Sequence, residues 1–123
     1  MTVCLDTTVF IDFLRGHAAA NRLILGLEAP PLASELCRVE VLQGLRPEEQ
    51  KLADDLFRLI DWIPVVELIS TRAGELGRQW RPSHSGIGIA DLVIAATVEL
   101  TDSRLLTRNV KHFPMIQGLR PAY

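Results

Sequence analysis

The sequence predicts an α/β fold in which a parallel sheet is covered by helices on both faces. Short apolar runs, such as Val3–Leu5 and Ile63–Val66, have the length and composition of buried strands. Segments with apolar residues at helical spacing separate these runs along the chain. Short strands that alternate with helices are typical of a parallel sheet buried on both sides.

The composition is that of a single domain with a full hydrophobic core. The chain has 123 residues, of which 48% are hydrophobic, and a formal net charge of −2. This length is close to the commonest size of one domain, so residues 1–123 are expected to form one. No apolar stretch reaches the length of a membrane span, and no basic region precedes one near Met1, so we expect a cytoplasmic protein without membrane contact. Cys4 and Cys37 lie in apolar runs and are expected to be buried free thiols.

Caps and helix breakers set the expected elements of the first half of the chain. The first strand is followed by a helix that ends before Gly16, and Ala18–Leu27 is predicted as a second helix. Pro31–Ala33 is predicted as a short strand. Ser34 is then a suitable N-cap for a helix that runs to Gly44.

The second half continues the alternation. Pro47 fits the first turn of a further helix, and the β-branched run Ile63–Val66 predicts the third strand. Ser70 is a suitable cap for the next helix. Ile89–Leu100 is apolar nearly all round, which indicates a buried helix. Arg104–Thr107 is predicted as a strand, with one more edge strand in the residues that follow.

Three carboxylates occupy positions where charge is uncommon. Asp6 follows the first buried strand, Glu40 interrupts an apolar helical run, and Asp91 lies in the first turn of the apolar helix. Parallel strands end at one edge of a sheet, where α/β proteins bind ligands, so the three acids can converge there. Clustered carboxylates cannot all ionise without a cation, and hard oxygen ligands suit Mg²⁺ or Mn²⁺. Such a site polarises a phosphodiester and activates water.

Polar residues also follow the last predicted strand. Asn109 is placed to hydrogen-bond to an acid or to a metal-bound water, and Arg108 and Lys111 are placed to meet phosphates. Thr7 and Thr8 follow Asp6 directly, where their hydroxyls either cap the helix or contact the site. Asp12 is predicted to be a surface residue of that helix.

Four segments of the chain, in this order, resemble the PIN-domain ribonucleases, and specifically the VapC-type toxins of bacterial toxin–antitoxin pairs. The segments are LDTTVFIDFLRG, SELCRVEVLQGLR, GIGIADLVIAAT and LLTRNVKHFPMIQGL. The resemblance covers nearly the whole chain. It implies a three-layer α/β/α fold with a parallel sheet in the order 3-2-1-4-5. It also implies a Mg²⁺- or Mn²⁺-dependent endoribonuclease that forms a homodimer and is inhibited by a cognate VapB-type antitoxin.

The resemblance also assigns the site residues. Asp6, Glu40 and Asp91 match the family's acidic metal ligands and catalytic residues. Asn109 stands where many PIN domains have a further Asp. Because Asn brings no charge, one tightly held metal ion is expected.

Two other functions remain open from the residues themselves. An aspartyl phosphotransfer domain also has an Asp at the end of its first strand, as Asp6 is here. However, Thr8 stands where a haloacid-dehalogenase-like phosphatase has a second Asp, and Lys111 is a poor match to the Lys of a response-regulator receiver. A non-catalytic RNA- or protein-binding module on the same scaffold is the other alternative, and the intact acids argue against it.

Overall fold

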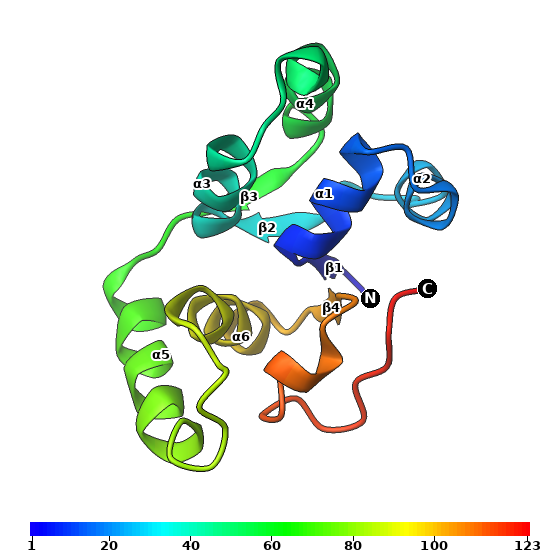
Figure 1. Ribbon diagram of the computed structural model, residues 1–123. Coiled ribbons are helices and arrows are strands. Elements are labelled where there is room, and N and C mark those ends of the chain that lie inside the picture. The colour runs from blue at the N-terminus through cyan, green and yellow to red at the C-terminus, as the bar shows by residue number, and fades with distance from the viewer.

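The computed structural model describes residues 1–123 and contains a sheet between two layers of helices (Figure 1). The strands are β1 Val3–Leu5, β2 Leu32–Ser34, β3 Asp61–Ile63 and β4 Arg104–Leu106. The helices are α1 Thr7–Leu14, α2 Ala18–Leu25, α3 Glu35–Gln43, α4 Gln50–Phe57, α5 Glu67–Trp80 and α6 Ile89–Thr101, with short 3₁₀ turns η1 Pro47–Glu49 and η2 Val110–His112. None of these helices is long and apolar enough to cross a membrane.

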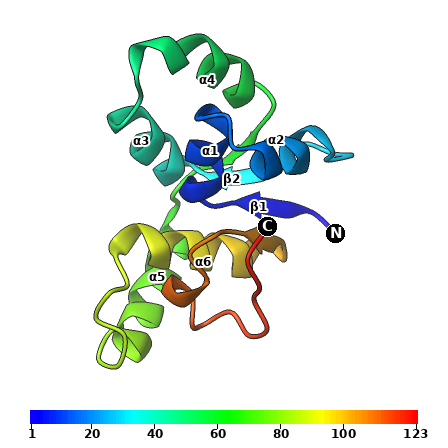
Figure 2. The same cartoon turned by 45° about the vertical axis from the view of Figure 1, so that its right-hand side comes forward.

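The sheet is parallel throughout, in the order β3-β2-β1-β4. On the central strand β1, Cys4 lies opposite Leu32 on one side and Leu105 on the other. Helices α1 to α4 lie on one side of the sheet, and α5 and α6 lie on the other (Figure 2). The predicted three-layer α/β/α architecture is therefore confirmed, and all four strands end at the same edge of the sheet.

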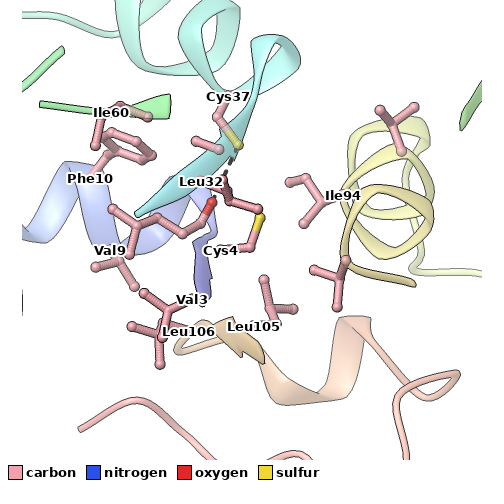
Figure 3. Packing of buried hydrophobic residues seen from close by; sticks show 14 of the residues in the cluster. Val3, Cys4, Val9, Phe10, Leu32, Cys37, Ile60, Ile94, Leu105 and Leu106 are labelled. Atoms are coloured by element: carbon pink, nitrogen blue, oxygen red, sulfur yellow. Dashed lines mark hydrogen bonds between the residues drawn. The ribbon is translucent and has the colours of Figure 1, made fainter. Parts of the chain in front are cut away.

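The core is one cluster of 29 buried apolar residues centred on β1. Side chains from both helical layers reach this strand: Phe10 of α1 and Ile94 of α6 approach it from opposite sides (Figure 3). Cys4 and Cys37 are buried and unpaired, as expected. Burial raises the pKa of Cys4 to about 12, so this thiol stays protonated at neutral pH and is a core residue.

The predicted fifth strand is wrong, and with it the order 3-2-1-4-5. The residues after η2 return to the sheet, but they form only one backbone hydrogen bond with its edge, from Ala122 N–H to the Thr107 carbonyl at 2.9 Å. Pro114 and Pro121 have no N–H to donate to a ladder. Gly118 adopts a left-handed conformation at φ +74°, which turns the chain out of an extended path.

Two predicted boundaries also needed correction. The third strand is Asp61–Ile63 rather than Ile63–Val66, so the prediction shares only Ile63 with it, and Pro64 cannot continue the ladder. Helix α5 begins at Glu67 rather than after Ser70, whose N–H donates to the Val66 carbonyl within the first turn. Val66 caps this helix without a side-chain hydrogen bond. In contrast, Ser34 caps α3 as predicted, with its hydroxyl accepting from Leu36 N–H at 3.1 Å.

Candidate active site

Asp6 lies at the carboxyl end of the central strand and is held there on both sides. Its backbone N–H donates to the Leu106 carbonyl of β4 at 3.0 Å. Its side chain is only 4% exposed, and Oδ2 accepts hydrogen bonds from the hydroxyls of Thr8 at 2.8 Å and Thr107 at 2.7 Å. These two donors compensate part of the cost of burying a carboxylate. The Asp6 side chain is therefore fixed before any ligand binds.

Glu40 comes to the same end of the sheet from α3. Its Oε1 accepts a 2.6 Å hydrogen bond from the hydroxyl of Thr7, the residue next to Asp6. The side chain of Glu40 is half-buried. Because Thr7 and Thr8 are consecutive and donate to different acids, one short segment of α1 orients two of the three carboxylates.

Asp91 is in the first turn of α6, where Oδ2 accepts the Gly88 N–H at 2.9 Å. The same oxygen lies 3.3 Å from Nδ1 of His112 in η2. Burial raises the pKa of Asp91, and the nearby Asp6 carboxylate adds to this, while the Gly88 N–H and His112 act in the opposite direction without cancelling it. Asp6 and Asp91 are therefore close enough for their negative charges to repel each other.

The three carboxylates have a common feature that suits a cation. Each uses one oxygen for hydrogen bonds within the protein, and the other oxygen receives no protein donor: Oδ1 of Asp6, Oε2 of Glu40 and Oδ1 of Asp91. No buried side-chain oxygen lacks a partner, so these three free oxygens all reach the surface. No Lys or Arg forms an ion pair with any of the three acids. The donor set thus fits a hard divalent cation.

The side chains do not form a closed metal cage. No three His, Cys, Asp or Glu side chains lie close enough together to bind one ion. This matches the coordination habit of Mg²⁺, which keeps several waters and takes one or two carboxylates together with substrate phosphates.

The other predicted site residues lie beside the acids rather than among them. The backbone N–H of Asn109 donates to the Thr107 hydroxyl at 2.9 Å, and the half-buried Asn109 amide makes no hydrogen bond to an acid. Arg108 is exposed and bonded to Asp12 at 2.8 Å. Lys111 is exposed and has no ionic partner. The hydroxyl of Thr7 donates to Glu40 and that of Thr8 donates to Asp6.

Three residues of this region were missed by sequence reasoning. Thr107 supports Asp6 from 101 residues away, His112 pairs with Asp91, and Asp12 binds Arg108 and Tyr123 instead of being a free surface acid. Thr107 and His112 carried a usable signal, since both flank the polar segment after β4. Asp12 carried none, because helical spacing alone does not indicate what packs over a helix.

Comparison with known proteins agrees with this architecture. The PIN domain family matches residues 3–116. Ribonuclease VapC19 of Mycobacterium tuberculosis is 43% identical over 122 residues, which cover 97% of this chain and 98% of that protein. Ribonuclease VapC10 of the same organism is 37% identical over 98% of this chain and 92% of that protein. A toxin–antitoxin complex from Klebsiella pneumoniae contains a chain with 25% identity and a TM-score of 0.83, with 99% of this chain and 98% of that one covered. The chain belongs to the PIN-domain family, and within it to the VapC ribonucleases.

Proposed function

We propose that this chain is the toxin of a toxin–antitoxin pair, an endoribonuclease that uses Mg²⁺ or Mn²⁺ and acts in the cytoplasm as a single domain. The observation that carries the proposal is the set of three carboxylates at one end of the sheet, each with a free oxygen and none paired with Lys or Arg. Such a site attracts a divalent cation and, through it, the phosphodiester of RNA. The similarity to two proteins named as ribonucleases supports the same substrate.

The residues of the site have distinct tasks in this reaction. Asp6 and Asp91 would hold the cation, which when bound supplies Lewis-acid activation of the phosphodiester and of water. Glu40 is oriented by Thr7, and its free Oε2 is available to hold the attacking water or accept its proton. Water adds to phosphorus, the bond to the 3′ oxygen breaks, and that oxygen takes a proton, which gives 5′-phosphate and 3′-hydroxyl ends. Asn109 lies beside the acids, where its neutral amide would hydrogen-bond to a metal-bound water.

Incubation of the purified chain with whole-cell RNA tests this function. We expect cleavage in Mg²⁺ or Mn²⁺, none in EDTA, and 5′-phosphate ends at the mapped cuts. Cleavage that persists in EDTA would exclude the metal-dependent mechanism. Absence of cleavage, with RNA binding retained, would favour the non-catalytic module, and a phosphorylated Asp6 after incubation with a phosphodonor would favour a phosphotransfer domain.

We also propose that the protein is inhibited by a VapB-type antitoxin, because the solved relative from Klebsiella pneumoniae is a toxin–antitoxin complex. The unpaired acids offer a natural target for an antitoxin cation. Co-expression with the cognate antitoxin is expected to restore growth to cells that express this chain. The proposal loses its support if the two proteins do not co-purify.

A homodimer is proposed from the apolar side chains that the monomer leaves exposed. Val39 and Leu42 of α3 are 57% and 45% exposed, and Leu68 of α5 is 66% exposed. Burial of such side chains commonly drives association. We expect Leu68→Glu to convert the dimer into a monomer in light scattering. Leu25→Glu is the matched control, since Leu25 is 75% exposed but lies on α2, on the other side of the molecule (Figure 1). A parent protein that is monomeric at micromolar concentration would contradict the proposal.

The basic residues after β4 are expected to contribute to RNA affinity. Each phosphate contact releases counterions when RNA binds, so the logarithm of the binding constant falls as the logarithm of the salt concentration rises. Removal of one contact reduces the steepness of this slope by about 0.7 for single-stranded RNA. Arg108→Ala and Lys111→Ala should therefore weaken binding of a labelled single-stranded RNA and reduce this slope. Lys51→Ala is the control, because the Lys51 side chain is 89% exposed on α4 and pairs with Asp55. An unchanged slope in both variants would mean that this segment is only solvated surface.

A further inference from the structure

Asp12 of α1 connects two segments that are far from it in the sequence, the residues after β4 and the C-terminus. Its Oδ2 accepts a hydrogen bond from Nη1 of Arg108 at 2.8 Å and another from the Tyr123 hydroxyl at 2.5 Å. The Asp12 side chain is only 17% exposed, although it lies on the outer part of α1. Partial burial acts to raise the pKa of Asp12, but the hydrogen bonds from Arg108 and Tyr123, together with the charges of Arg108 and His17, hold the pKa below its usual range. The carboxylate therefore stays ionised and keeps its hold on the arginine.

Arg108 is restrained by Asp12 and yet open to a ligand. Its side chain is 50% exposed, and Asp12 occupies only one of its guanidinium donors. The backbone N–H of Arg108 also donates to the Thr8 hydroxyl at 3.3 Å, and that hydroxyl donates to Asp6 at 2.8 Å. The arginine is thus connected to the acidic site through a single threonine.

A hollow of about 300 Å³ lies at this point of the surface. It is lined by Thr8, Ile11, Asp12, Arg108 and Asn109, and Ile11 is the only apolar residue among them. Its volume is at the lower end of the range for sites that hold small ligands. A polar hollow with an arginine in its wall, next to a site for phosphodiester chemistry, suits an anionic group of modest size.

We propose that this hollow holds the phosphodiester adjacent to the one that is cut, with Arg108 as its contact and Asp12 as the residue that positions Arg108. This inference rests on the proposed ribonuclease function. A guanidinium that is already fixed loses less conformational freedom when RNA binds, and its free donors match a phosphate in fork geometry. Tyr123 supports Asp12 from the other side.

The alternative role for Asp12 gives the opposite sign in an experiment. If Asp12 were an ordinary surface acid, it would repel RNA, and Asp12→Asn would strengthen RNA binding by removing a negative charge. If Asp12 positions Arg108, the same substitution weakens binding, although the surface becomes more positive. The direction of the change in affinity therefore distinguishes the two roles.

The test measures the affinity of a fluorescein-labelled single-stranded RNA in EDTA, where no cleavage occurs, for the parent, Asp12→Asn, Arg108→Ala and the double variant. We expect Asp12→Asn to weaken binding about two- to fivefold, the range that an exposed ion pair supplies. In the Arg108→Ala background, where Asp12 has no arginine to position, the same substitution should not weaken binding. Asp12→Glu, which retains the ion pair, should bind within about twofold of the parent.

Glu99→Gln is the matched control. Glu99 makes a similar pair with Arg72 at 2.9 Å, but it joins α5 to α6 instead of flanking the hollow. Loss of the ion pair between Glu99 and Arg72 should leave RNA affinity unchanged. Tighter binding by Asp12→Asn, or equal weakening with and without Arg108, would overturn the positioning role. If the parent chain neither binds nor cuts RNA, the proposed ribonuclease function fails first, and that outcome is visible without any variant.

Discussion

Asp6→Asn is expected to abolish RNA cleavage while the fold stays intact. Asp6 is the most buried of the three acids, and it lies at the end of the central strand between β4 and α1. Asn has nearly the same shape, and its side-chain oxygen can still accept the hydroxyls of Thr8 and Thr107. Only the negative charge is lost, and with it the attraction for a divalent cation. We expect a decrease in cleavage rate of at least about 100-fold, as for the loss of other preorganised electrostatic groups in active sites.

Asp102→Asn is the matched control for this prediction. Asp102 is an exposed acid at the C-terminal end of α6, with a left-handed backbone at φ 49° that Asn also tolerates. It should cleave RNA at the parent rate. Circular dichroism and melting curves establish that both variants are folded. Retention of more than about a tenth of the parent activity by Asp6→Asn would mean that Asp6 is not essential to the chemistry.

The parts of the site that could be predicted are those encoded by local sequence. An apolar run that stops at a carboxylate predicted both β1 and the position of Asp6. A polar residue in a continuous apolar helix predicted Asp91, and Ser34 predicted the start of the helix that carries Glu40. In each case, the signal lies within a few residues of the feature, and the parallel topology then brings the strand ends to one edge.

The parts that could not be predicted depend on long-range contacts. The hydrogen bond from Thr107 to Asp6 and the pair of Arg108 with Asp12 join residues 101 and 96 positions apart. No periodicity encodes such contacts. The missing fifth strand has a related cause, since the family pattern suggested a strand where Pro121 and the left-handed Gly118 prevent a continuous ladder. Helix α5 was placed too late because Val66 begins it without a polar side-chain cap.

The second large effect is expected in thermal unfolding with and without Mg²⁺. Asp91 has a higher pKa in the folded protein than in the unfolded chain, chiefly because it is buried and then because Asp6 is close. Ionising it therefore costs folding free energy. This cost is absent below the unfolded pKa of about 3.9, and it is complete once the pH has risen through the folded value, so it applies at neutral pH. In EDTA at pH 7, Asp91→Asn should melt a few degrees higher than the parent.

A cation that binds only the folded protein should reverse the order of the two melting temperatures, so that the parent melts higher than Asp91→Asn. At a Mg²⁺ concentration about 100 times its Kd, binding stabilises the folded state by about 2.7 kcal/mol, which corresponds to an increase of about 10 °C in Tm for a chain of this size. The parent should gain this shift, and Asp91→Asn should lose most of it, because a neutral amide is a weaker ligand than a carboxylate. Asp102→Asn, at the other end of the same helix, should respond to Mg²⁺ as the parent does. Equal Mg²⁺ shifts in the parent and in Asp91→Asn would show that Asp91 only caps α6, and the cation would then have to be held by Asp6 and Glu40 without it.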